Sequence, residues 1–504
     1  MTNVNREKNA KRNIYVSLIS QLITMICGLI TPRLLLGAFG SEANGAATSI
    51  STFLGYIILL EGGIGGVARA ALYKPLAEND EQKISEIMTE IKRFFRRVGY
   101  VFFIYVVILA CTYKSISHTE VLDWWSSFLL VLIISGSTFA QYFIGISNAV
   151  LLNASQKLYV TNTVSVIGTI LNTIMVAILT SYGCSLLVVK LVSSIVFALK
   201  PIALWLYVKK NYNIKSIKGR GIALKDKWTG LGQHIAFFLH SHTDVVVLTL
   251  FGDLLSVSVY SVYYMITNSV QSIVTSFSTG MEAVFGDMYA KKEMETLNRT
   301  FSMYETLISI ISIIMFGSTM VLIIPFVRLY TKNITDTNYI QLLFGILLTT
   351  AALIHCLRSP YHSMVIAAGH FRQTKAAAYG EAIINIMSSI ILVVKYGLVG
   401  VAIGTVLATL FRLIFYAVYL SKNIIKRNVF LCLKREMVNI GAIISIYLIG
   451  KSVTSFFLID SFFVWICVGV LVVVCAAAIT GLFNLVFYKQ DCVLLKGKML
   501  KRRL

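Results

Sequence analysis

Charged residues are scarce in this sequence. Asp, Glu, Lys and Arg make up 13% of its 504 residues, against roughly a quarter in soluble domains, whereas hydrophobic residues make up 57%. Each helix that crosses a hydrocarbon core needs about 20 apolar residues, so fourteen crossings would take about 280 residues. The composition therefore excludes soluble enzymes, DNA-binding proteins and disordered scaffolds, and it predicts an all-α polytopic membrane protein.

Motifs for covalent chemistry are missing as well. None of the eight cysteines belongs to a CxxC pair, which argues against a metal site or a disulfide scaffold. The loops contain no Walker sequence, no glycine-rich phosphate cradle and no zinc-ligand spacing. We therefore expect no catalytic residue, no metal and no cofactor. The first apolar run is of full length and follows a polar, basic start, which predicts a retained span rather than a cleaved signal.

Acidic residues are about half as common as basic ones, 23 against 45. In a soluble chain the net charge of +22 would suggest nucleic acid, but here the positive-inside rule explains it better. With the N-terminus inside, the cytoplasmic segments hold 34 Lys and Arg residues and the outer loops hold 3. This asymmetry predicts about 14 spans with both termini in the cytoplasm. The apolar runs fall at about 13–36, 44–72, 98–113, 121–150, 158–181, 185–208, 231–251, 256–288, 301–330, 338–368, 376–394, 398–421, 437–458 and 462–487.

This topology can be tested by labelling single cysteines in a background without the native ones. The charge asymmetry places Asp253 outside and Lys218 in the cytoplasm. On intact cells, an impermeant maleimide should modify a cysteine at position 253 and spare one at position 218. The reverse pattern would overturn the fourteen-helix topology.

The chain repeats itself at an offset of about 212–214 residues. Tyr182-Gly183 matches Tyr396-Gly397, and Lys200 matches Arg412. The same offset joins Phe39-Gly40 with Phe251-Gly252, Asn172 with Asn385, and Tyr207 with Tyr419. Six helices return the chain to the side where it began, so the halves are related by an axis along the membrane normal, as in parallel-repeat transporters. We expect two six-helix lobes around a central cavity, plus two extra C-terminal helices.

The predicted domain boundaries follow from these helices. The outer loops have at most about ten residues each, which is too short for a catalytic domain. The segments are a cytoplasmic N-terminus at 1–12, an N-lobe at 13–208, a basic cytoplasmic linker at 209–230, a C-lobe at 231–421, a cytoplasmic loop at 422–436, helices 13 and 14 at 437–487, and a basic cytoplasmic tail at 488–504.

Three segments resemble a known family. They read LLEGGIGGVARAALYKPLAEND (59–80), HTDVVVLTLFGDLLSVSVYSVYYMI (242–266) and RSPYHSMVIAAGHFRQTKAAAYGEAIINIMSSIILVVKYGLVGVAIGT (358–405). Together they resemble the polysaccharide flippases (Wzx type) of the multidrug/oligosaccharidyl-lipid/polysaccharide exporter superfamily, over essentially the whole chain. The resemblance implies transfer of a polyprenyl-(pyro)phosphate-linked oligosaccharide from the inner to the outer leaflet of the cell membrane, for polysaccharide export. Its expected partners are membrane lipids, a proton or sodium ion, and polysaccharide polymerase and glycosyltransferases.

Three other functions are alternatives to a polysaccharide flippase: a lipid II flippase, a multidrug exporter and a membrane enzyme. Lipid II flippases share the fourteen-helix plan, but their usual arginine cluster in helices 1 and 2 is represented here only by Arg33 and Arg69. Cation-coupled multidrug exporters of the same superfamily usually have twelve helices. An integral-membrane glycan polymerase would need catalytic groups outside, and an acyltransferase would need a reactive histidine, such as His355 or His362, beside a substrate tunnel. The sequence favours the polysaccharide flippase.

Ionisable residues at membrane depth usually face a cavity or pair with one another. Arg33, which follows Pro32 in the first span, and Arg69 in the second are candidate phosphate ligands, because a guanidinium can bind phosphate through two hydrogen bonds. Snorkelling and packing are the alternatives for these two. Arg358 is a third substrate-binding candidate, but it could instead form a buried ion pair with Glu381 that holds the second lobe together. The repeat positions of Lys200 and Arg412 predict a symmetric structural role.

Two carboxylates are candidates for ion coupling. Asp244 and His240 are four residues apart and would share a helix face. A desolvated carboxylate beside an imidazole can titrate near neutral pH, as a proton or sodium site requires. Glu61 lies near the middle of the second span, where Gly65 and Gly66 could instead form a tight packing seam. Three tyrosines at the outer end of span 8 predict an interface belt or a sugar-stacking surface: Tyr260, Tyr263 and Tyr264.

Overall fold

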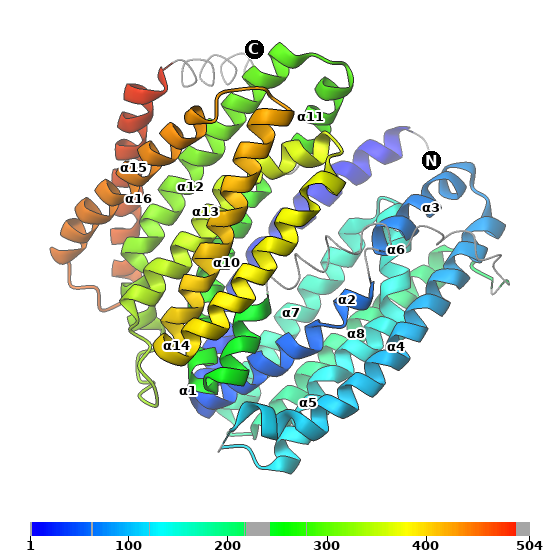
Figure 1. Ribbon diagram of the computed structural model, residues 1–504. Coiled ribbons are helices and arrows are strands. Elements are labelled where there is room, and N and C mark those ends of the chain that lie inside the picture. The colour runs from blue at the N-terminus through cyan, green and yellow to red at the C-terminus, as the bar shows by residue number, and fades with distance from the viewer. Residues whose placement is uncertain are drawn as a thin grey trace. The chain divides into compact units, whose positions relative to one another are not determined.

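The computed structural model describes residues 3–61, 64–119, 121–215, 217, 242–278 and 280–489. Within these residues every regular element is a helix (Figure 1). The prediction of an all-α protein is therefore confirmed. The chain divides into two compact units, Met1–Ser258 and Val259–Leu504.

The first unit contains the N-terminal helices. They are α1 (Asn3–Gly55), α2 (Ile58–Glu61), α3 (Ile64–Glu78), α4 (Glu81–Ser117), α5 (Trp124–Ala140), the π-helix η1 (Gln141–Gly145), α6 (Ile146–Ala154), α7 (Leu158–Ser181), α8 (Leu186–Asn211) and the short helix His242–Phe251. Hydrogen bonds from backbone N–H groups to nearby carboxylates fix where some of these helices begin. The Asp80 carboxylate accepts the backbone N–H of Lys83 at 3.0 Å to begin α4, and Asp123 accepts that of Ser126 at 3.1 Å to begin α5.

Helix α1 is two helices joined at Gly40. This glycine has φ +80° and ψ 179°, a left-handed conformation that favours glycine, and it separates residues 3–39 from 41–55. A continuous helix of 53 residues would be about 80 Å long, far more than the hydrocarbon core, which is about 30 Å thick. The break therefore gives α1 two membrane crossings. Pro32, by contrast, lies inside the first of them.

The second unit contains the remaining helices. They are α10 (Leu254–Ser276), which begins in the first unit, and α11 (Met281–Ala290), α12 (Met294–Tyr330), α13 (Leu342–Ala367), α14 (Phe371–Asn423), α15 (Phe430–Ser455) and α16 (Phe462–Phe487). Helix α14 is a hairpin with Gly397, at φ +53°, as its turn. The amide of Asn385 in the first arm donates to the hydroxyl of Thr405 in the second at 3.2 Å, so the arms lie side by side.

Most of the described helices could cross a membrane. Ten are long and apolar enough to span a membrane, and two of these, Lys11–Glu61 and Phe371–Asn423, each contain two crossings because of their glycine breaks. Helix α10 has 23 residues, whereas the helix His242–Phe251 is short and falls at the end of the predicted span 231–251, whose first part lies outside the described residues. The predicted polytopic membrane fold is confirmed, and the chain is a multi-pass membrane protein.

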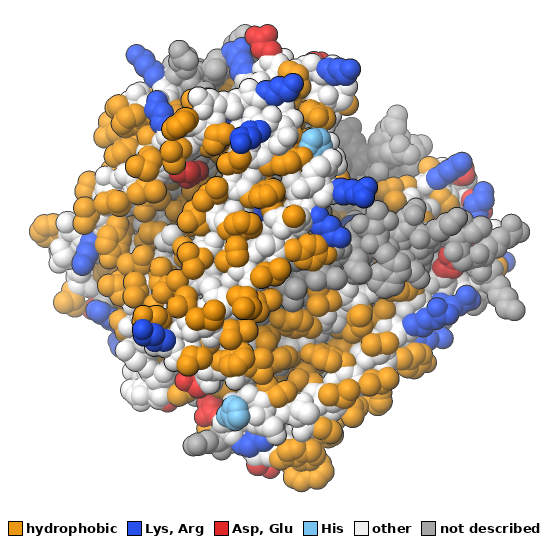
Figure 2. Space-filling view, in the orientation of Figure 1, with side chains coloured by type: hydrophobic (Ala, Val, Ile, Leu, Met, Phe, Trp, Pro, Cys, Tyr) orange, Lys and Arg blue, Asp and Glu red, His pale blue; other side chains and the backbone are white. Residues whose placement is uncertain are grey.

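The last two helices pack against α12 within the second unit. Their contact is close because Gly450 of α15 has no side chain: a Cβ there would lie 2.7 Å from the side chain of Val321. The buried residues of this contact are Ile313, Val321, Leu322, Ala442, Ile446, Val468, Val472 and Ala476. Figure 2 shows that hydrophobic side chains also predominate on the visible outer surface of these helices, as contact with lipid requires.

The predicted interface belt at the start of α10 is wrong for two of its three tyrosines. Tyr260 and Tyr263 are 4% and 0% exposed, and only Tyr264 is substantially accessible. The hydroxyl of Tyr263 donates to the backbone carbonyl of Tyr339 at 2.8 Å. The ring of Phe344 lies against Tyr263 as well. Tyr263 thus anchors the connection between α12 and α13 and does not belong to an aromatic girdle.

Candidate functional site

A cavity of about 520 Å³ lies inside the first unit. Its walls come from α1, α2, α5, η1, α6 and α8, so segments up to about 140 residues apart in the chain build it. Hydroxyl, amide and charged groups interrupt the apolar lining. The polar lining residues are Ser51, Glu61, Ser137, Thr138, Gln141, Tyr142, Lys190, Ser193 and Ser194.

Two interruptions of regular helix shape this cavity. Tyr56 and Ile57 break the helical path between α1 and α2, just before Glu61. On the opposite wall, α5 passes through the five-residue π-helix η1 before it continues as α6. A π-helix widens the turn and re-aims its side chains, and such segments are frequent at functional sites. Here it places Gln141 and Tyr142 on the cavity wall.

Glu61 and Lys190 bring opposite charges to the cavity. The carboxylate of Glu61 accepts a hydrogen bond from the Tyr142 hydroxyl. Lys190, on α8, forms no ion pair with any carboxylate in the described ranges of the chain. A cation and an anion that line one cavity without neutralising each other leave both available to a polar ligand. The structure thus places Glu61 where it can meet a ligand or an ion.

Asp244 is a buried residue of the first unit and lies among a second group of polar side chains. It is 3% exposed and lies on the helix His242–Phe251 close to Tyr56, whose hydroxyl hydrogen-bonds with Thr243. One turn further, Thr249 donates to Ser49 at 2.9 Å, which fixes this helix against the second arm of α1. Its predicted partner, His240, lies outside the described residues.

Arg33 and Arg69 lie apart from the lining of the 520 Å³ cavity. Arg33 is half-buried after Pro32 in α1. Arg69 is also half-buried, and its Nε donates to the carbonyl of Gly65 in its own helix at 3.2 Å. A Cβ at Gly65 or Gly66 would meet no atom within 4 Å, so the tight packing seam expected at these glycines is wrong.

The second unit brings Arg358 and Glu381 together. Nη1 of Arg358 lies 2.5 Å from the Glu381 carboxylate, and Nη2 lies 3.0 Å from Nδ1 of His355. Arg412, from the second arm of α14, binds the other oxygen of Glu381 and donates to the Tyr416 hydroxyl at 3.2 Å. All three charged side chains are nearly fully buried. Both terminal nitrogens of Arg358 are engaged, so its predicted contact with substrate would require this cluster to open.

The repeat explains why Lys200, the first unit's counterpart of Arg412, has no carboxylate like Glu381 beside it among the described residues. At the repeat offset, Glu381 corresponds to Gly168, and Arg412 corresponds to Lys200. In the structure Lys200 does lie against Gly168, and its ammonium contacts Thr169 Oγ1 at 3.4 Å and the ring of Phe197. The same helix contact is thus built in both units, but only the second carries the carboxylate.

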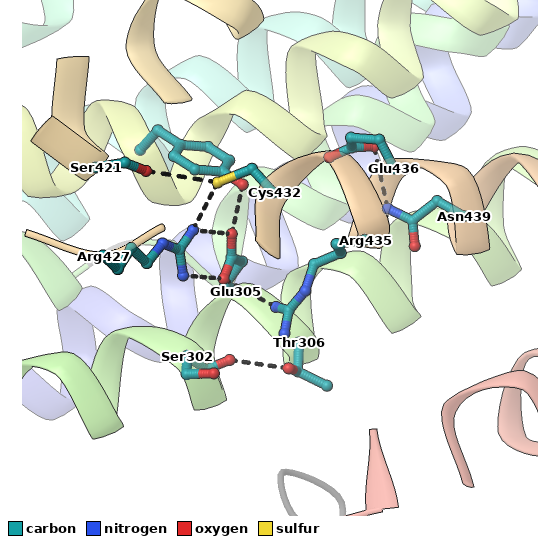
Figure 3. A network of polar contacts seen from close by, with 10 residues as sticks. Ser302, Glu305, Thr306, Ser421, Arg427, Cys432, Arg435, Glu436 and Asn439 are labelled. Carbon is teal, nitrogen blue, oxygen red and sulfur yellow. Dashed lines mark hydrogen bonds and ion pairs between the residues drawn. The ribbon is translucent and has the colours of Figure 1, made fainter. Parts of the chain in front are cut away.

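A second charged network joins three helical segments of the second unit (Figure 3). Glu305 of α12 accepts both terminal nitrogens of Arg427 at 2.7 and 2.8 Å, and pairs with Arg435 of α15 at 3.0 Å. It also accepts the hydroxyl of Tyr361. Burial by itself would lower the pKa of the Arg427 guanidinium. Its hydrogen bonds and charge interaction with Glu305 outweigh burial, so the pKa lies above its usual range. The network fastens α15 and the end of α14 to α12.

Sequence reasoning did not find several of these residues. Gln141 and Tyr142 become visible only once η1 and its neighbours are assembled. In the sequence Lys190 is only a basic residue inside a predicted span, and its place on a cavity wall depends on how α8 packs. Glu305 could have been singled out in the sequence, because it is a lone acid at the start of an apolar run.

The fold is similar to three solved structures. One is the lipid II flippase MurJ in an inward closed conformation, with 17% identity, a TM-score of 0.70, and coverage of 94% of this chain and 99% of that chain. Another is a multidrug resistance MATE family transporter of the MOP superfamily in an inward-facing conformation, with 15% identity, a TM-score of 0.64, and coverage of 80% and 98%. The third is the MATE multidrug transporter DinF-BH in complex with R6G, with 18% identity, a TM-score of 0.59, and coverage of 84% and 96%. No protein-family model and no curated protein sequence matches the chain. The chain therefore has the fold shared by these transporters.

Proposed function

We propose that this protein is a flippase that moves a polyprenyl-(pyro)phosphate-linked oligosaccharide from the inner to the outer leaflet of the cell membrane. The observation that carries the proposal is the similarity to a lipid flippase structure over 94% of the chain. Three segments of the sequence also resemble polysaccharide flippases. The protein performs no covalent chemistry in this account, and its termini lie in the cytoplasm.

The extra helices favour a flippase over a multidrug exporter. The similarity to MATE transporters spans 95–98% of their own chains but only 80–84% of this one. The lipid flippase structure matches 94% of the chain, a difference of the size of α15 and α16. Both helices pack against α12 of the second unit, and the ion pair of Arg435 with Glu305 ties α15 to it, so they are an integral part of this fold.

The polar groups of the first unit suit a glycan phosphate. We assign substrate binding to Arg33 and Arg69, whose guanidinium groups match phosphate oxygens. Lys190 is a third cation of this unit, on the wall of the 520 Å³ cavity that Arg33 and Arg69 do not line, and the hydroxyl and amide groups of that cavity can bind sugar hydroxyls. The lipid tail would stay in the bilayer while the two lobes, predicted at 13–208 and 231–421, rock around the head group. Consumption of the product outside by a polymerase, or an ion gradient, would drive net transfer.

We expect Asp244 to couple transport to an ion gradient. Asp244→Asn keeps the shape of this buried side chain and removes its charge. In proteoliposomes this variant should lose the dependence of flipping on an imposed proton or sodium gradient, while Asp244→Glu should keep part of it with a displaced pH optimum. Asp287→Asn, which changes an exposed acid, is the matched control. If Asp244→Asn still responds fully, Asp244 is a structural polar group and Glu61 becomes the candidate.

Two assays separate the proposed function from its competitors. In detergent there are no two sides to transport between, so the protein should leave purified lipid-linked oligosaccharide chemically unchanged. In proteoliposomes it should not expel a cationic dye such as rhodamine 6G. Glycan elongation or acyl transfer in detergent would show an enzyme, and dye export without lipid transfer would show a multidrug exporter.

A further inference from the structure

A basic pocket lies on the first unit, separate from the cavity at Glu61. Its volume is about 290 Å³, a little over half that of the larger cavity. Four of its six lining residues are cations. The lining consists of Thr89, Lys92, Arg93, Arg96, Ile214 and Lys215.

Two chain segments build this pocket. Lys92, Arg93 and Arg96 stand on α4 at spacings of one and three to four residues, so they share one side of the helix. The segment after α8 runs beside the start of α4. There Asn213 donates to Glu81 at 3.3 Å, and the backbone N–H of Lys215 donates to Ser85 Oγ at 3.1 Å. These contacts bring Lys215 to the cations of α4.

The positive charge of the pocket is not neutralised within the described part of the chain. No ion pair among the described residues includes Lys92, Arg93 or Arg96. Glu90, the buried acid of α4, is only 9% exposed and does not line the pocket. Like charges at helical spacing repel one another, so a bound anion would stabilise them. Two guanidinium groups and an ammonium match the oxygens of a phosphate.

The same side of α4 becomes apolar immediately beyond the pocket. Tyr100, Phe103 and Val107 continue the stripe from Arg96 at three- and four-residue spacing and are 59%, 57% and 38% exposed. In Figure 2, basic side chains are followed by hydrophobic ones along the surface where Figure 1 places α4. A soluble phosphate would use only the basic part of this surface. A phospholipid would use both parts, with its acyl chain along the aromatic stripe.

We propose that this pocket binds the phosphate-bearing head group of an anionic phospholipid. The acyl chain of that lipid lies along Tyr100, Phe103 and Val107. The lipid is a bound component of the membrane rather than the transported cargo, so the site is independent of the proposed function and would stand if the cargo were different.

The test is lipid binding to the full-length purified protein by native mass spectrometry. The wild type should retain phosphatidylglycerol in preference to the zwitterionic phosphatidylcholine. Arg93→Gln with Arg96→Gln should weaken phosphatidylglycerol binding about tenfold or more, because each lost cation removes attraction for the head group. Arg93→Lys with Arg96→Lys should keep part of the binding. Lys209→Gln with Lys210→Gln removes the same charge from the last turn of α8, outside the pocket, and should leave binding unchanged.

Two further measurements show whether the bound phosphate belongs to a phospholipid or to a soluble molecule. Phe103→Asn should weaken binding of the lipid although it removes no charge, and millimolar glycerol 3-phosphate should fail to displace the lipid. Displacement by glycerol 3-phosphate would show a site for soluble phosphates and overturn the proposal. An equal loss in the Lys209→Gln, Lys210→Gln variant would show unspecific attraction to charge and overturn it as well. Each variant should elute and melt like the wild type, since the changed side chains are exposed or only half-buried.

Discussion

Glu381→Gln should destabilise the folded protein by about 3–5 kcal/mol, the usual cost of removing one partner from a buried ion pair. The substitution leaves Arg358 and Arg412 as two buried cations without a counter-charge. Their repulsion adds to the loss of the two hydrogen bonds. The expected result is a large fall in the melting temperature of the detergent-solubilised protein, measured by loss of its folded fraction on heating.

A matched set of variants shows whether charge is the cause. Glu282→Gln changes an exposed acid in the first turn of α11 and should leave the melting temperature unchanged. Arg358→Met, Glu381→Leu and Arg412→Met together remove all three charges, and this triple variant should recover most of the lost stability because apolar replacements of a buried cluster are commonly neutral. If Glu381→Gln melts like the wild type, the cluster does not hold the second unit together.

Arg33→Ala and Arg69→Ala should each reduce flipping about tenfold or more, because a charged hydrogen-bonding partner contributes about 1.5–3 kcal/mol. Both side chains are half-buried and could reach a head group that enters beside them. Lysine at either position should restore part of the activity, since it keeps the charge but loses the planar pair of donors. The measurement is the initial rate of lipid transfer in proteoliposomes at equal protein content.

Arg299→Ala serves as the control for these two variants. Arg299 is an exposed arginine near the start of α12 and is not a lining residue of the cavity, so its loss should leave the rate unchanged. Full activity of both Arg33→Ala and Arg69→Ala would make these residues packing or interfacial groups. Substrate binding would then rest on Lys190 and the hydroxyl groups around it.

The helices could be predicted because a membrane constrains them strongly. The apolar runs at 158–181 and 462–487 coincide with α7 and α16, since charges or turn residues bound each run and its length must match the bilayer. The repeat also shows in the structure: Gly183 and Gly397, matched at one offset, both have positive φ. Such a turn depends on the backbone conformation alone, and a glycine in the sequence indicates that conformation.

The polar contacts were harder to predict because they depend on packing between distant segments. Glu61 meets Tyr142 across 81 residues, through a π-helix that leaves no clear mark in the sequence. Glu305 meets Arg427 across 122 residues, and at a predicted helix end its charge looks like one that faces water. Sequence spacing reveals pairs on one helix or on two helices that follow each other in the chain, such as Arg358 and Glu381. It does not reveal which helices become neighbours.

The central claim is transfer of a lipid-linked oligosaccharide, and the most direct measurement follows that lipid across a bilayer. Purified protein is placed in liposomes that contain a polyprenyl-pyrophosphate oligosaccharide with a fluorescent sugar, and an impermeant reductant is added outside. The reductant should bleach nearly the whole pool when the wild type is present, and only the outer-leaflet pool with the Arg33→Ala, Arg69→Ala double variant. An inner-leaflet pool that stays protected with the wild type, while rhodamine 6G crosses the same membranes, would contradict transfer of the lipid-linked oligosaccharide.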